Sequence, residues 1–240
     1  MTSPARQRGV RALVIALRSA ALITTAWALI SRADCVFATT CRATNLLSYF
    51  TVQSNIAFVL LTTLLIIWTA MGRAETSWLT TVRAIVTSYL VISGVTFAIL
   101  METAGLRELS FLVPLSSKVL HFVVPVYAVI DFAVFPGRRR VPLHRALWAL
   151  LYPLAYSILI TARGRSLNWY PYVFFDPEWV GGYAGVLAYA AVLAAALVAV
   201  AALLVLVTRL PTPAQPRPVR GSARPGPSRR AGMPRDRPGG

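Results

Sequence analysis

The chain alternates between long apolar stretches and short segments rich in charged residues, proline and glycine. The apolar stretches lie near residues 12–30, 48–71, 79–101, 113–135, 143–162 and 183–208. A helix rises about 1.5 Å per residue, so about 20 apolar residues suffice to cross the hydrocarbon core of a bilayer. The pattern therefore predicts an all-α fold, an integral membrane bundle of about six transmembrane helices.

The composition agrees with a membrane-embedded chain. Apolar residues make up 57% of the sequence and charged residues 13%, which leaves too little polar surface for a water-soluble fold. The formal net charge of +16 would also suit a nucleic-acid-binding protein. The basic residues, however, lie mainly between and beyond the apolar stretches. We therefore expect them to set membrane topology, and we expect no nucleic-acid partner.

An even number of spans places both ends of the chain on one side of the membrane. Most arginines fall on that side, including Arg73 and Arg83, which we assign to the loop after the second stretch. The side richer in Lys and Arg is normally cytoplasmic. We predict a cytoplasmic N-terminus over 1–11, a six-helix transmembrane domain over 12–208 and a disordered cytoplasmic tail rich in Arg, Pro and Gly over 209–240. The expected location is the plasma membrane.

The two cysteines of the chain, Cys35 and Cys41, lie in one short loop with five residues between them. They can form a disulfide if the loop faces an oxidising compartment, and two unpaired thiols are the alternative. No histidine accompanies them, so the loop has too few ligands for zinc. The chain also has no P-loop, GxGxxG, GxSxG or HExxH motif. We therefore expect neither a metal nor a cofactor.

Polar side chains gather at the start of the second stretch, where hydrocarbon makes them costly unless they are hydrogen-bonded. Thr51 and Asn55 are four residues apart, and Ser54 is three residues from Thr51. This spacing places all three on one helix face. Such residues often only hydrogen-bond neighbouring helices in membrane bundles, which is the alternative to a functional role.

The fourth stretch contains His121 about 12 Å from its outer end, and Thr51 should lie in the same leaflet. A neutral imidazole at that depth can exchange a proton, or it can be a hydrogen-bonded packing residue. Asp131 follows ten residues later, at a depth similar to that of Arg18 on the first stretch. Because each charge alone is costly in the membrane, we expect Arg18 and Asp131 to form a structural ion pair.

Three runs of residues occur in a recognisable order: Tyr49-Phe50-Thr51-Val52-Gln53-Ser54-Asn55, then His121-Phe122-Val123-Val124-Pro125 ending in Asp131, then Trp169-Tyr170-Pro171-Tyr172 with Asp176-Pro177. Together they resemble the actinobacterial Pr6Pr family of membrane proteins. The resemblance covers the six-span region, roughly 12 to 208. That family is, more distantly, similar to the androgen-induced-gene family of eukaryotic membrane proteins, which also have about six spans.

The androgen-induced-gene proteins hydrolyse fatty acid esters of hydroxy fatty acids with an intramembrane threonine nucleophile and a histidine partner. The resemblance implies that Thr51 and His121 fill these roles here, with membrane lipids as partners and a lipid ester as substrate. Proximity suggests that Ser54 and Asn55 donate hydrogen bonds to the developing oxyanion. The alternative is a non-enzymatic membrane module, a small transporter or an assembly partner, in which the same polar residues only hold helices together.

Overall fold

The computed structural model describes residues 4–37, 42–103 and 113–210, and the described residues form helices and connecting turns without a strand. This confirms the all-α prediction. The expected disordered tail falls almost entirely on residues 211–240, which lie outside the described residues.

Six helical stretches of the described chain are long and apolar enough to cross a membrane, which confirms the predicted bundle of a polytopic membrane protein. The spans are α1 (Pro4–Phe37), α3 (Phe50–Ala70), α4 (Ser77–Thr103), the composite of α5 (Leu115–Lys118), η2 (Val119–Val123) and α6 (Val124–Val134), the composite of η3 (Leu143–Leu150) and α7 (Leu151–Leu167), and α8 (Tyr183–Val207). Two short helices, α2 (Ala43–Leu47) and η4 (Val173–Phe175), lie between spans.

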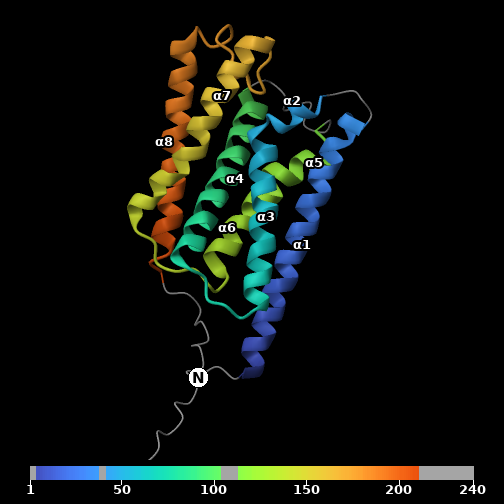
Figure 1. The fold of residues 1–240 in the computed structure, drawn as a ribbon, viewed down its shortest axis with the longest axis vertical. Helices are drawn as coiled ribbons and strands as arrows, with labels where there is room; N and C mark the ends of the chain where they lie inside the picture. Colours follow the sequence, from blue (N-terminus) through green and yellow to red (C-terminus); the bar gives the residue numbers. More distant parts are fainter. Residues whose placement is uncertain (1–3, 38–41, 104–112, 211–240) are drawn as a thin grey trace, which may run out of the picture.

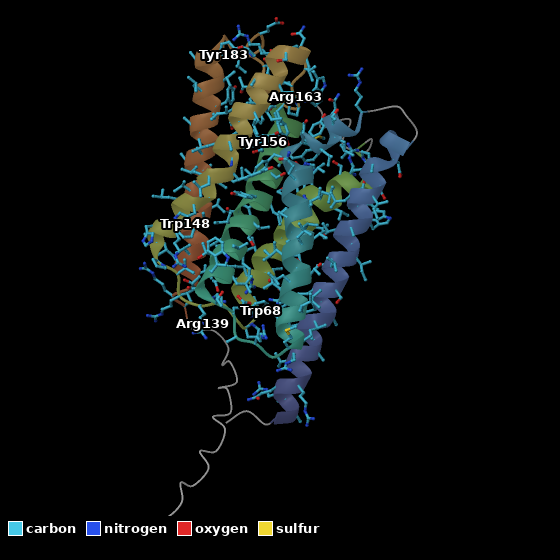
Figure 2. All side chains as sticks on the ribbon, in the orientation of Figure 1. Trp68, Arg139, Trp148, Tyr156, Arg163 and Tyr183 are labelled. Atoms are coloured by element: carbon cyan, nitrogen blue, oxygen red, sulfur yellow. The ribbon has the colours of Figure 1, made fainter. Side chains whose placement is uncertain are left out.

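The spans form an elongated bundle in which α1 packs on α3, and α4 contacts α3, α6 and α8 (Figure 1). The start of α1 and the end of α8 lie at one end of the bundle, and α2 lies at the other. Figure 2 shows Trp68 and Arg139 at the end with the termini, and Arg163 and Tyr183 at the opposite end. That the end with the termini faces the cytoplasm remains a prediction.

Helix α8 is almost wholly apolar, so the distribution of apolar residues does not by itself show which face packs inward. Leu197, Ala201 and Leu204 follow one another at intervals of three or four residues and are buried against α4 and η3. Leu187 and Leu203 are exposed, and on a spanning helix such side chains face lipid. Packing against α4, rather than hydrophobicity alone, therefore fixes which face of α8 points inward.

The fourth span is interrupted by one π turn, η2, in which the N–H of Val124 bonds to the carbonyl of Val119, five residues back. The cause is local, since Pro125 has no N–H and its ring would clash with the carbonyl of His121 in a regular α-helix. A wider turn relieves that clash. His121 thus lies within the wider π turn of the fourth span.

Gly94 of α4 lies directly against this turn. A Cβ atom at Gly94 would overlap the carbonyl oxygen of His121 and would touch the ring of Pro125. The absence of a side chain at Gly94 therefore lets α4 approach the backbone of His121, with Ser93 next to the contact.

Replacing Gly94 with alanine is expected to lower the apparent melting temperature in detergent. Overpacking between two backbones costs about 1–3 kcal/mol, partly offset by the better helix propensity of alanine. Gly9→Ala on α1 is the matched control, because a Cβ there meets nothing within 4 Å. An equal melting temperature for Gly94→Ala and Gly9→Ala would show that the close approach is not required.

Candidate functional site

Thr51 lies in the first turn of α3, which begins at Phe50 after an extended Tyr49. Its side chain is buried, and its carbonyl accepts hydrogen bonds from Ser54 Oγ at 3.1 Å and from Asn55 Nδ2 at 2.8 Å. These donors point at the Thr51 carbonyl rather than at the Thr51 hydroxyl. The geometry therefore gives no support to the expected oxyanion role of Ser54 and Asn55, whose hydrogen bonds instead stabilise the start of α3.

His121 reaches Thr51 from the π turn, with Nε2 lying 3.1 Å from Thr51 Oγ1. The other ring nitrogen, Nδ1, lies 2.8 Å from the carbonyl oxygen of Ser117. Because a carbonyl only accepts, Nδ1 carries the hydrogen, and in the neutral ring Nε2 is then the acceptor. The Thr51 hydroxyl therefore donates to His121. Phe97 stacks on the imidazole with ring centroids 3.9 Å apart and holds its plane.

Ser93 of α4 completes a chain of hydroxyls, with its Oγ 2.7 Å from Thr51 Oγ1. Since the Thr51 hydrogen is directed to His121, Ser93 is the donor in this contact. The sequence reasoning did not single out Ser93. It is one of several hydroxyl residues on α4, and its neighbour Gly94 is where α4 closely approaches the backbone of His121.

Tyr172, from the segment between α7 and α8, reaches the same place. The backbone N–H of Thr51 donates to Tyr172 Oη at 3.4 Å. Burial raises the pKa of the Tyr172 phenol, so it stays protonated and retains an O–H to donate. The sequence analysis named Tyr172 only within the third of the runs that carry the family resemblance. The N–H groups in the first turn of a helix have no partner within the helix. The expected start of α3 near Thr51 was therefore the available signal that a partner would be needed there.

The hydroxyls and the imidazole form part of the wall of a cavity of about 250 Å³. Apart from Thr51, Ser93, His121 and Tyr172, most of its wall is aliphatic or aromatic and comes from α4, α7, α8 and η4. The structure thus brings Thr51 and His121 together on the wall of an apolar cavity.

Comparisons of the chain with protein-family models, with curated proteins and with solved structures find no match. Interpretation of the site therefore depends on its geometry.

A second polar cluster lies nearer the end of the bundle that carries the termini. Arg18 Nε donates to Asp131 Oδ1 at 2.8 Å, so the two residues expected to pair are in contact. The fuller picture is a neutral group of four side chains, which we call the charge quartet: Arg18, Glu75, Arg83 and Asp131. All four are buried, with Arg18 and Arg83 each 1% exposed.

Arg83 connects the two carboxylates of the charge quartet. Its Nη2 lies 2.7 Å from Asp131 Oδ2, and its Nη1 lies 2.6 Å from Glu75 Oε1. The assignment of Arg83 to a loop was therefore wrong, because the residue is part of α4 and is fully enclosed. Its position near the predicted end of a span suggested exposure, whereas Glu75 in the preceding connection neutralises it.

Two further expectations concern metals and thiols. Within the described ranges there is no group of three or more His, Cys, Asp and Glu side chains placed to hold a metal ion. The choice between a Cys35–Cys41 disulfide and two unpaired thiols lies outside the described residues, since neither Cys41 nor the side chain of Cys35 is among them.

Proposed function

We propose that this polytopic membrane protein is an intramembrane hydrolase of lipid esters, with Thr51 as nucleophile and His121 as general base. The observation that carries the proposal is the 3.1 Å contact between Thr51 Oγ1 and His121 Nε2 on the wall of an apolar cavity. A threonine hydroxyl needs a base within hydrogen-bond reach to become a nucleophile. The resemblance of the flanking runs to Pr6Pr proteins agrees with this assignment.

The first half of the reaction transfers the acyl group to the protein. His121 Nε2 takes the Thr51 proton while Thr51 Oγ1 attacks the ester carbonyl carbon. The carbonyl oxygen becomes an oxyanion, and we assign the O–H of Tyr172, whose oxygen accepts from the Thr51 N–H, as the donor to it. The imidazolium then gives its proton to the leaving alkoxide, which departs as the alcohol and leaves an acyl ester on Thr51.

The second half regenerates Thr51. His121 takes a proton from a water molecule, whose oxygen attacks the acyl ester, and returns the proton to Thr51 Oγ1 as the acid leaves. Ser93 donates to Thr51 Oγ1 throughout and stabilises the negative charge that develops there in both halves. Ser117 keeps the imidazole in the required tautomer through its carbonyl.

A second candidate is a non-enzymatic membrane module. The same hydrogen bonds join α3, α4 and η2, and such contacts between helices stabilise membrane bundles without any chemistry. In this alternative, the contact of Thr51 with His121 only holds α3 and η2 together, and no reaction takes place in the cavity.

The proposal predicts that purified protein releases fatty acid from at least one member of a panel of lipid esters, while the Thr51→Ala variant does not. A fluorophosphonate probe is expected to label wild-type protein at Thr51, and labelling is expected to fall in His121→Ala, since the hydroxyl is no longer activated. The measurements are acid release by mass spectrometry and the labelled peptide after digestion. No release from any ester, together with no labelling, would favour the non-enzymatic module.

A further inference from the structure

The cavity extends well beyond the hydroxyls of Thr51 and Ser93. Its lining on α8 runs from Leu187 to Leu197, a distance of about 15 Å at the rise of a helix. Thr51, Ser93 and His121 line it from three other elements, α3, α4 and η2. A long apolar space therefore leads away from the reactive hydroxyl, more than an ester group alone requires.

The cavity also opens toward lipid. Ile158 of α7 and Leu187 of α8 both line it, and they are 71% and 70% exposed. Both lie within membrane-spanning helices, so their exposed faces meet hydrocarbon rather than water. Leu154, one turn before Ile158, lines the cavity and is exposed as well. The mouth between α7 and α8 is thus apolar and admits hydrocarbon chains more readily than polar headgroups.

Two alanines of α8 leave space in the wall of the cavity. Ala190 and Ala194 lie one turn apart on α8 and both line the cavity, between the larger side chains of Leu187 and Leu197. Tyr156, visible on α7 in Figure 2, and Phe175 of η4 form other parts of the wall. A large side chain at either alanine would project into the apolar space without touching Thr51 or His121.

We propose that the space between α4, α7 and α8 is a subsite for one acyl chain, drawn sideways from the bilayer, and that Ala190 and Ala194 set how much of the chain it accepts. This inference rests on the proposed function only for the ester that carries the chain. The subsite itself follows from the apolar lining, the mouth in the lipid-facing surface and the two small residues.

The test compares Ala194→Phe and Ala190→Phe with Ala195→Phe, a matched control whose alanine is exposed on the same helix and does not line the cavity. Hydrolysis of nitrophenyl esters is measured for acyl chains from acetyl to palmitoyl. We expect both cavity variants to lose at least about tenfold in kcat/KM for palmitoyl ester and to keep acetyl ester hydrolysis, because only the long chain needs the filled space. Ala195→Phe is expected to follow wild type at every length.

A binding measurement separates the subsite from the chemistry. A diazirine-bearing palmitate methyl ester is incorporated in phosphatidylcholine vesicles with the Thr51→Ala protein and irradiated. The inference predicts crosslinks to cavity-lining residues of α7 and α8. Because the phenyl ring fills the space, we expect them to be reduced at least about fivefold when Ala194→Phe is added and to be unchanged by Ala195→Phe. Crosslinking without hydrolysis in wild type would overturn the proposed function and leave the subsite standing. Equal crosslinking, or equal chain-length profiles, in the cavity and control variants would overturn the subsite.

Discussion

Turnover of a lipid ester is expected to fall by about a thousandfold or more when Thr51 or His121 is replaced by alanine. Each replacement removes a chemical step, because Thr51→Ala removes the nucleophile and His121→Ala removes the base that activates it. A nucleophile and its base act as one unit, so the double variant is expected to be about as inactive as either single variant. The measurement is kcat/KM for the best ester of the panel, with circular dichroism to verify the helices.

Two further variants serve as a control and as a test of the oxyanion donor. Thr63→Ala is the matched control, since Thr63 is on the same helix and bonds only to its own turn through Val59 O, and it is expected to retain wild-type turnover. Tyr172→Phe keeps the ring but removes the proposed oxyanion donor, with an expected loss of about a hundredfold in kcat. Wild-type turnover in both Thr51→Ala and His121→Ala would show that Thr51 and His121 only hold helices together.

Removing Asp131 is expected to give the largest loss of stability. Asp131→Ala leaves Arg18 and Arg83 buried with only Glu75 to balance them, so the charge quartet gains one uncompensated positive charge. Breaking a buried ion pair in this way typically costs about 3–5 kcal/mol. The effect should appear as a lower melting temperature in detergent and a lower midpoint of unfolding.

A double-mutant cycle of Arg18→Ala with Asp131→Ala isolates the pair. The two losses are expected to be less than additive by at least about 1 kcal/mol, because removing both charges leaves Arg83 with Glu75 as a neutral pair. Arg165→Ala, an exposed arginine near the end of α7, is the control and is expected to change stability little. Strict additivity would mean that Arg18 and Asp131 do not interact energetically.

The sequence predicted the spans well because hydrocarbon imposes a length that is visible in any apolar run. The ends of the spans were less predictable. The first helix was expected over 12–30 and extends over Pro4–Phe37, since a helix can continue into polar surroundings after the apolar stretch ends. The fifth was expected over 143–162 and begins as a 3-10 turn at Leu143 before continuing to Leu167.

The candidate site was predictable in part. Depth arguments placed Thr51 and His121 in one leaflet, and the structure joins them. The contacts of Ser93 and Tyr172 could not be found in this way, because they depend on how closely α4 packs at Gly94 and on the path of the segment before α8. The spacing also suggested an oxyanion role for Ser54 and Asn55, whereas both side chains donate to the backbone carbonyl of Thr51. A shared helix face says which residues are neighbours, but not whether their donors point at a side chain or at the backbone.

The charge quartet has a consequence for how the chain is assembled during synthesis. Arg18 belongs to the first span, and its carboxylate partner Asp131 belongs to the fourth. A second carboxylate, Glu75, lies 4.0 Å from Arg18 and follows the second span, whereas Asp131 follows Arg18 by 113 residues. A lone arginine is costly within lipid. We therefore expect the first span to reach its final depth only after later spans have been made, when Glu75 and then Asp131 are there to neutralise Arg18.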